Sequence, residues 1–309
     1  MMKVLVTGAT GRVGQLLVPM LLEQGHQVRT IQRGNTSSTA DWADKVEAVT
    51  GTISDRSTVD KAMQGIDVVC HLAALMPPFT DDELLSANLI GTYNILESIR
   101  DTKPSARLVH VSTDAIYGTG FSQRTYPTTI AETTLPEPTN FYGITKVLCE
   151  DLVAHGARQF EIDYVMLRFS WVFSSHEILD LFSMPMWLDA MAPAQKAELT
   201  GSDAIPVLLE EDGSPFYEHV VDSRDAAKAC LLAINSKVTG EIFNVCGPRS
   251  FTYVEMSKVV AEKLGRTTVN VPLPSFHSYT FDLTKSRNLL KYEPDHSIES
   301  VVAEALAAR

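Results

Sequence analysis

Residues 7–14 read Thr-Gly-Ala-Thr-Gly-Arg-Val-Gly, and their place in the chain indicates the fold. The preceding residues 3–6 are an apolar run typical of a strand, and residues 15–24 carry leucines and a methionine at helical spacing. Gly8 permits the tight turn, Gly11 lets the backbone approach a pyrophosphate, and Gly14 lets the helix pack close to the strand. The helix amino terminus would present free N–H groups to the anion. The pattern therefore predicts a dinucleotide-binding loop.

A second motif, Tyr142-x-x-x-Lys146, predicts acid/base chemistry. Four residues along a helix bring two side chains onto one face, so the Lys146 ammonium can lie near the Tyr142 phenol. A free phenol has a pKa of roughly 10, and an adjacent cation favours its ionised form. No other tyrosine in the chain has a lysine four residues on, and the motif follows a strand-like run that ends at Ser112-Thr113.

Apolar runs alternate with helical patterns along the first half of the chain. The predicted strands are 3–7, 27–32, 46–49, 67–73, 106–112 and 163–168, and the predicted helices are 14–24, 56–64, 83–102 and 141–157. This alternation predicts an α/β fold with a doubly wound parallel sheet of the Rossmann type. Residues 170–217 interrupt it with four prolines and an apolar cluster between Phe182 and Met191, which we expect to be packing within a substrate lobe and lid.

Composition excludes several classes of protein. The chain has 309 residues with 45% hydrophobic content, enough for one core and a smaller lobe, and it shows no membrane-length apolar run and no signal peptide. A net charge of -12 argues against nucleic acid. Four single cysteines and eight unpaired histidines predict a reducing, cytoplasmic location and no metal site.

These motifs together resemble the extended short-chain dehydrogenase/reductase family, of the NAD-dependent epimerase/dehydratase type. The resemblance covers nearly the whole chain and also rests on residues 67–74, 88–92, 111–118, 167–169 and 240–245. It implies that residues 219–235 return to the first domain. We therefore expect a dinucleotide-binding domain of residues 1–169 and 219–247, and a smaller substrate-binding lobe and lid of residues 170–218 and 248–309.

The resemblance also implies a role for individual residues. Tyr142 is the expected general acid/base, Lys146 tunes it and holds the nicotinamide ribose, Thr113 hydrogen-bonds the reacting oxygen, and Asn88 supports a proton or water path. The expected cofactor contacts are Gly8, Thr10, Gly11, Arg12, Val13, Gly14, Arg33, Thr52, Ile53, Leu72, Ala73, Ala74, Tyr142, Lys146 and Phe169. The expected substrate contacts are Leu75, Thr113, Asp114, Ser170 and Trp171. Helices near 83–102 and 141–157 are implied to form a homodimer.

Cofactor choice depends on the end of the second predicted strand. An acidic residue there would bind the adenosine ribose hydroxyls and mark NAD. Gln32 occupies that position and Arg33 follows, so Arg33, together with Arg12, could pair with a 2′-phosphate. The sequence therefore favours NADP slightly over NAD, although an Arg33 that is solvated or stacked on adenine would leave NAD open.

The substrate region departs from the family's nucleotide-sugar enzymes. Trp171 and Glu218 stand where those enzymes carry an Asn and an Arg directed at the nucleotide diphosphate, and residues 269–280 hold no counterpart of a second Arg. Residues 170–218 carry many acids opposed by Lys196 alone, which is unfavourable for a diphosphate. Ala115 replaces the acidic residue that assists dehydration, and Asp114 is expected either to act as an acid or to cap the turn.

Three functions remain open on this basis. The first is an NAD(P)-dependent oxidoreductase that transfers hydride between nicotinamide and a secondary alcohol or carbonyl of a non-nucleotide substrate, such as a free sugar, a sugar acid or a small ketone. The second is a nucleotide-sugar (UDP-sugar) 4-epimerase with a rebuilt diphosphate site. The third is a dinucleotide-binding regulator without catalysis, against which the intact Thr113, Tyr142 and Lys146 argue.

Overall fold

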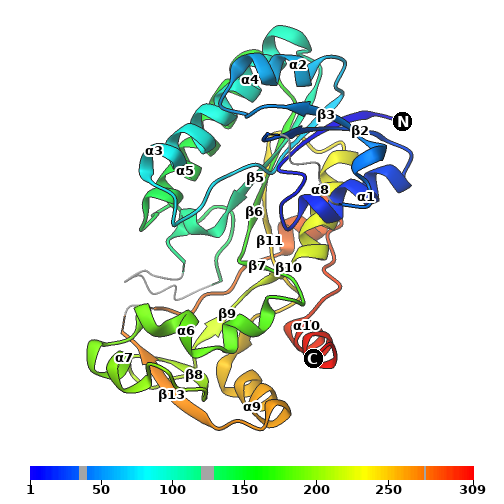
Figure 1. Cartoon of the computed structure of the whole chain (residues 1–309). Coiled ribbons are helices and arrows are strands. Elements are labelled where there is room, and N and C mark those ends of the chain that lie inside the picture. Colours follow the sequence, from blue (N-terminus) through cyan, green and yellow to red (C-terminus); the bar gives the residue numbers. More distant parts are fainter. Residues whose placement is uncertain (35–39, 120–128, 275) are drawn as a thin grey trace.

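The computed structural model describes residues 1–34, 40–119, 129–274 and 276–309. Its centre is a seven-stranded parallel sheet in the order β11-β6-β5-β4-β1-β2-β3 (Figure 1). The strands are β1 (Lys3–Thr7), β2 (Gln27–Gln32), β3 (Glu47–Thr50), β4 (Val68–His71), β5 (Arg107–Thr113), β6 (Tyr164–Phe169) and β11 (Glu241–Val245). This topology confirms the predicted doubly wound α/β fold.

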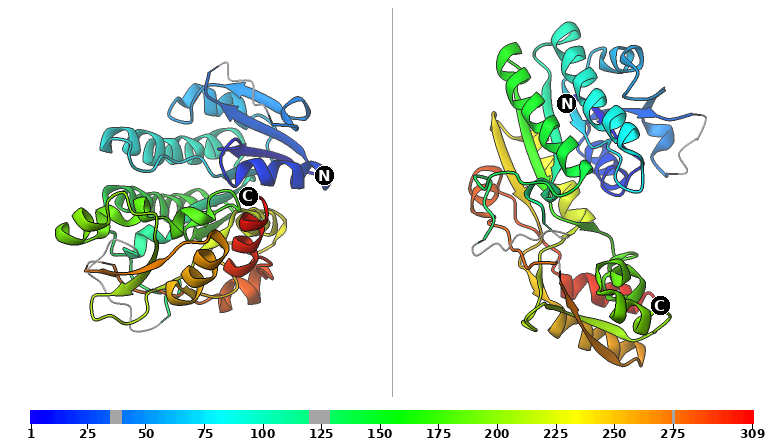
Figure 2. Two further views of the ribbon diagram at one scale, coloured as in Figure 1. Left: turned by 60° about the horizontal axis from the view of Figure 1, so that its bottom comes forward. Right: turned by 90° about the vertical axis from the view of Figure 1, so that its left-hand side faces the viewer.

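Helices cover both faces of the sheet (Figure 2). One face carries α1 (Gly14–Glu23) and α8 (Ser223–Asn235), and the other carries α2 (Arg56–Met63), α4 (Gly91–Thr102) and α5 (Phe141–Phe160). Neighbouring residues of β5 show how the strands supply both cores: Val109 packs in the core with α1 and α8, whereas Leu108 packs in the core with α2, α4 and α5. Side chains alternate between the two faces of a strand, so one apolar run fills both cores.

The helix predicted at 83–102 differs from the observed structure. It consists of α3 (Asp81–Leu84), a π-helical stretch at Leu85–Ile90 and then α4. Thr80 begins α3 with a capping box, in which its hydroxyl accepts from the Glu83 N–H and the Glu83 carboxylate accepts from the Thr80 N–H. The helical spacing of apolar residues does not distinguish a short π-helical turn from α-helix. The sequence therefore predicts one continuous helix.

A smaller lobe lies at the carboxyl end of β5, β6 and β11 (Figure 1). Its elements are β7 (Val172–Phe173), α6 (Met184–Trp187), α7 (Pro193–Leu199), β8 (Ile205–Glu210), β9 (Tyr217–Glu218), β12 (Phe251–Thr252), α9 (Tyr253–Leu264), β13 (Thr268–Leu273) and α10 (Ile298–Ala307), and β10 (Val221–Asp222) leads from it directly into α8. Strand β8 pairs in parallel with β13, β7 with β10, and β9 in antiparallel with β12.

The lobe has an apolar core of its own around Trp187. The Trp187 ring meets the rings of Tyr253 and Phe276 edge-on, at centroid distances of 5.7 and 5.3 Å. Phe182 and Met191 lie in the same core, so the apolar cluster of this segment packs inside the lobe. The division of the chain into domains at residues 170, 219 and 248 remains a proposal. Within the described residues, no helix has the length and apolar character needed to cross a membrane.

Candidate active site

Tyr142 lies in the first turn of α5, and its phenol lies close enough to the hydroxyl of Thr113, at the end of β5, for that hydroxyl to act on its pKa. Asn140 begins the helix by accepting a hydrogen bond from the Gly143 N–H at 2.8 Å. Burial raises the pKa of Tyr142, and the charge of Asp114 adds to this rise while the Thr113 contact opposes it. The phenol of the protein alone therefore keeps its proton near neutral pH.

Lys146 lies one turn further along α5 and is buried. Its Nζ donates to the main-chain carbonyl oxygen of Val111 at 2.7 Å, which fixes the amine at the carboxyl end of β5. Burial lowers the pKa of Lys146, and the nearby Cys149 and Glu150 oppose that shift. The effect of its charge on the Tyr142 phenol and its contact with a nicotinamide ribose remain predictions.

Asn88, in the π-helical stretch, is only 1% exposed and bridges two segments. Its Oδ1 accepts from the Leu75 N–H at 2.8 Å, and its Nδ2 donates to the Leu75 carbonyl oxygen at 3.0 Å and to Thr145 Oγ1 at 3.1 Å. Asn88 thus holds the loop after β4 against α5, and its predicted part in a proton path stays a prediction.

A cavity of about 740 Å³ lies at the carboxyl ends of β1, β2 and β4. That volume is in the range of cofactor sites. Its lining includes many residues predicted to contact the cofactor or substrate: Gly8, Thr10, Gly11, Arg33, Thr52, Ile53, Leu72, Ala73, Ala74 and Leu75. The lining also includes Gln32, Gly51, Ser54 and four residues near α3: Asp82, Glu83, Ser86 and Ala87. Val13 and Phe169 are instead buried in the core of the sheet.

The glycine loop has no room for side chains at its two ends. A Cβ at Gly8 would lie 2.8 Å from the Ala73 nitrogen, and Gly8 has a φ of 71°. A Cβ at Gly14 would lie 2.3 Å from the Gly8 carbonyl oxygen. The backbone is therefore folded tightly at the cavity edge, with the Gly11 N–H donating to the Gly8 oxygen at 3.0 Å. This cradle fits the pyrophosphate of a dinucleotide.

Arg12 extends from the same loop to Glu177 in the smaller lobe. The guanidinium makes two hydrogen bonds to this carboxylate, which also accepts from the hydroxyl of Ser174 at 2.8 Å. The predicted pairing of Arg12 with a 2′-phosphate would have to compete with Glu177, whereas Arg33 lies in the cavity lining.

Apart from Leu75, which lines the large cavity, the predicted substrate residues lie at the carboxyl ends of β5 and β6. Asp114 and Ser170 are each 3% exposed, and Trp171 is partly buried against Trp187 and Phe173. Burial raises the pKa of the Asp114 carboxyl to about 6, which exceeds the lowering by its contacts with Thr119 and Thr113. Asp114 therefore has an unusual environment for a residue whose only role is to cap a turn.

Glu218 is completely buried at the end of β9. The Tyr253 phenol donates a hydrogen bond to the Glu218 carboxyl group, and the Tyr279 phenol donates a second one at 3.4 Å. Burial raises the pKa of the Glu218 carboxyl to about 7. A carboxyl group in this position offers no positive charge to a diphosphate.

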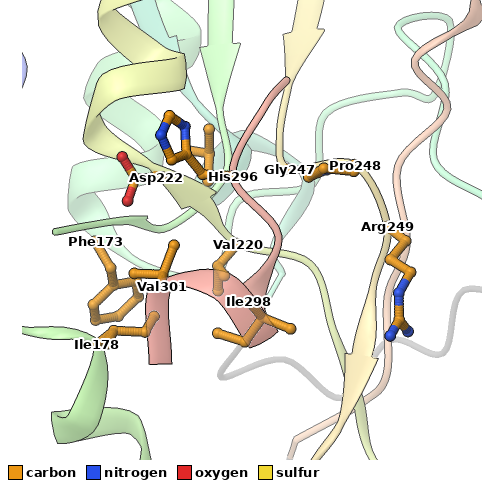
Figure 3. A pocket seen from close by; sticks show the side chains of 11 residues that line it. Phe173, Ile178, Val220, Asp222, Gly247, Pro248, Arg249, His296, Ile298 and Val301 are labelled. Carbon is orange, nitrogen blue, oxygen red and sulfur yellow. The ribbon is translucent and has the colours of Figure 1, made fainter. Parts of the chain in front are cut away.

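A second, much smaller cavity lies between the sheet domain and the lobe (Figure 3). Asp222 and His296 lie on one side of it, and Phe173, Ile178 and Val301 on another. Its volume is about 10 Å³, which holds no more than a single water molecule. It is therefore not a substrate or cofactor site.

Sequence reasoning missed three residues that shape the site: Glu177, Tyr253 and Tyr279. Glu177 contacts Arg12 across 165 positions of sequence, and Tyr253 and Tyr279 contact Glu218 across 35 and 61 positions. No local motif marks such contacts; the acid-rich composition of residues 170–218 was the only available signal.

The sequence profile described as the NAD dependent epimerase/dehydratase family matches residues 4–246. A ketoreductase of Stigmatella aurantiaca that acts on a farnesylated 3-oxo-dihydroquinoline oxide is 36% identical over 120 residues, which are 38% of this chain and 36% of that protein. The match thus spans about a third of that relative. UDP-glucose 4-epimerase of Mycoplasma pneumoniae is 26% identical over 326 residues, covering 98% of this chain and 95% of that protein.

A solved structure shows the same fold along the whole chain. It is a short-chain dehydrogenase/reductase superfamily protein from Agrobacterium tumefaciens with bound NAD, with a TM-score of 0.86 and 26% identity. The superposition covers 99% of this chain and 97% of that one.

Proposed function

Because this chain belongs to the NAD-dependent epimerase/dehydratase family, we propose that Tyr142 is the general acid/base of a hydride transfer at a secondary alcohol carbon. The protein is an enzyme of the extended short-chain dehydrogenase type, within the range of dehydrogenases, reductases and epimerases. The observation that carries the proposal is the closeness of the Tyr142 phenol to the Thr113 hydroxyl at the end of β5, the strand that pairs with β4, after which Leu72 and Ala73 line a cavity that fits a dinucleotide. A bound nicotinamide would supply the hydride chemistry.

The protein's own residues would handle the proton. Thr113 would hold the substrate oxygen through its hydroxyl, and Tyr142 would exchange a proton with that oxygen. Because burial favours the protonated phenol, Tyr142 carries the proton that a carbonyl oxygen would receive. To accept a proton from an alcohol it needs added positive charge nearby, and the buried Lys146 would provide part of that charge.

Two substrate classes compete, and a different observation favours each. Most relatives with a named sugar substrate act on nucleotide sugars, and this supports a nucleotide-sugar 4-epimerase more than a free-sugar oxidoreductase. The site residues point to a non-nucleotide substrate, because Glu218 is buried and hydrogen-bonded to two tyrosines where an Arg would contact a diphosphate. The ketoreductase relative and an L-arabinose 1-dehydrogenase from Haloferax volcanii are named for substrates without a nucleotide.

Titration of UDP into the cofactor-loaded enzyme separates the two classes. Micromolar binding would support the epimerase, which interconverts its substrates with no net reduction of cofactor. Absence of UDP binding, together with growth of the absorbance of reduced cofactor on free sugars or small alcohols, would support the oxidoreductase.

For the cofactor, we infer that both NAD and NADP are accepted, with NADP slightly favoured. The solved relatives with a bound cofactor contain NAD. Arg33 lies in the cavity lining next to the neutral Gln32, whose Nε2 donates to Thr30 Oγ1 at 3.1 Å. The absence of an acidic side chain at position 32 removes the repulsion that a 2′-phosphate would meet in an NAD-specific site.

We also propose a homodimer formed by the helical segments near 83–102 and 141–157. Apolar side chains on these helices are exposed: Ile90 and Tyr93 on one segment and Ile144 and Leu148 on the other are each 41–44% exposed. Such a face suits contact with a second copy of the chain. Sedimentation analysis would give the mass of a dimer. A cytoplasmic location stays a prediction.

A further inference from the structure

We propose that Asp114 makes the substrate site select a neutral or cationic group beside the reacting carbon and reject a carboxylate there. The inference rests on the proposed function, because it concerns the substrate on which Tyr142 and Thr113 would act. It holds for free sugars and for nucleotide sugars alike, because it concerns the sugar ring and not the diphosphate.

Asp114 is directly beside the reacting groups. It follows Thr113 in the chain, and its Oδ1 accepts a hydrogen bond from the Thr113 hydroxyl at 3.2 Å. Its charge also acts on the phenol of Tyr142. A substrate oxygen held by Thr113 and Tyr142 would therefore bring its neighbouring carbons close to this carboxylate.

One oxygen of Asp114 is left without a partner. Asp114 is 3% exposed, and its Oδ2 is buried with no hydrogen-bond partner among the described residues. A buried carboxylate oxygen without a donor is unfavourable, so a hydroxyl or ammonium group that reached it would gain a strong hydrogen bond. A carboxylate has no proton to offer to this oxygen.

A second unpartnered group follows the end of the neighbouring strand. β5 and β6 end at the paired residues Thr113 and Phe169, so Asp114 and Ser170 are the residues that directly follow the two strand ends. Ser170 is also 3% exposed, and its Oγ has no hydrogen-bond partner within the described part of the chain. The carboxyl edge of these strands therefore offers one acceptor and one hydroxyl, the set that binds a polyhydroxy ligand.

Asp114 has an acidic neighbour and lacks an ion-pair partner. Glu218 is fully buried and acts electrostatically with Asp114, and its hydrogen bonds come from the phenols of Tyr253 and Tyr279. Among the described residues, neither acid forms an ion pair with a lysine, arginine or histidine. A buried carboxylate without an ion-pair partner attracts a cation and repels an anion.

The test uses two matched pairs that differ in charge at a single carbon: D-glucose with D-glucuronate, and UDP-glucose with UDP-glucuronate. Equilibrium binding is measured on the Tyr142→Phe protein loaded with oxidised cofactor, so that turnover does not interfere. We expect the neutral member of the pair that binds to bind at least about tenfold more tightly. Asp114→Asn in the same background should remove most of this preference, because it keeps the shape and the Oδ1 acceptor but loses the charge.

Asp180→Asn is the matched control, since Asp180 is an exposed acid of the smaller lobe and its loss changes the net charge equally. It should leave the preference unchanged. Equal or tighter binding of the acid member, no binding by either pair, or an unchanged preference in Asp114→Asn would overturn the proposal. If the preference is present but the wild-type enzyme turns over neither pair, the proposed function fails while the charge selection stands.

Discussion

Arg12 in the glycine loop and Glu177 in the smaller lobe form a two-point ion pair, with Nε donating to Oε2 at 2.6 Å and Nη2 to Oε1 at 2.5 Å. Both side chains are partly exposed, at 38% and 36%. The pair joins the loop that would hold the cofactor phosphates to the lobe that would hold the substrate. Its geometry therefore links cofactor retention to the position of the lobe.

Loss of this ion pair should speed the release of cofactor. A partly exposed pair contributes about 1 kcal/mol or less, so Arg12→Met and Glu177→Gln should each raise the dissociation rate of reduced cofactor about 2- to 5-fold. The double variant should release cofactor no faster than the single variants, because both remove the same interaction. Stopped-flow fluorescence of the reduced cofactor measures these rates. Glu198→Gln, at an exposed acid of α7, is the control, and equal rates in all variants would contradict the link.

Gly14→Ala should destabilise the protein. The new Cβ would lie 2.3 Å from the Gly8 carbonyl oxygen and 2.7 Å from the Ala9 Cα, and backbone atoms cannot move aside easily. We expect a loss of about 1–3 kcal/mol in the free energy of unfolding. Gly156→Ala in α5 is the control, because its Cβ would meet only side-chain atoms at 3.6 Å or more, and alanine favours a helix interior by about 0.5–1 kcal/mol. Urea unfolding measures both, and equal stability of the two variants would contradict the crowding at Gly14.

Arg33→Ala should weaken NADP binding much more than NAD binding. If Arg33 pairs with the 2′-phosphate, the dissociation constant for NADP should rise about tenfold while that for NAD changes less than about twofold. Fluorescence titration with the two reduced cofactors gives the ratio. Arg266→Ala removes an exposed arginine far along the chain and serves as the control. Equal weakening of both cofactors would assign Arg33 to stacking on adenine.

Glu218 should make the protein less stable as the pH rises. Burial raises its pKa from 4.5 to about 7, so the folded state binds the proton more tightly than the unfolded state does. The stabilisation of the folded state by this proton is complete below pH 4.5 and is lost as the pH rises to about 7. It corresponds to about 3 kcal/mol in the free energy of unfolding. Glu218→Gln should therefore show a smaller fall in unfolding free energy between pH 5 and pH 7.5 than the wild type. Parallel pH profiles for the two proteins would show that Glu218 titrates normally.

The sequence predicted the sheet well because its strands are short apolar runs with clear boundaries. The six predicted strands agree with β1 to β6 apart from small differences at the ends, for example 67–73 against Val68–His71. The elements between residues 170 and 217 could not be predicted, because they are only two to seven residues long and are held by a shared core around Trp187. Local propensity contains little information about elements that tertiary packing stabilises.

Part of the site was likewise predictable from the sequence, and part was not. Thr113 and Tyr142 could be placed in one site because the family resemblance joins them, and the structure has Thr113 at the end of β5 and Tyr142 in the first turn of α5. The partners of Arg12 and Glu218 could not, since each contact joins residues far apart in sequence. The unpartnered oxygen of Asp114 is a property of packing, which only the structure shows.

Turnover by Tyr142→Phe tests the central claim most directly. The variant keeps the aromatic ring and loses only the hydroxyl that would exchange the proton. With the substrate class that UDP titration identifies, we expect turnover to fall at least about 10³-fold while the affinity for cofactor stays within about twofold of the wild type. Turnover near the wild-type rate, with cofactor bound normally, would contradict the assignment of Tyr142 as the general acid/base.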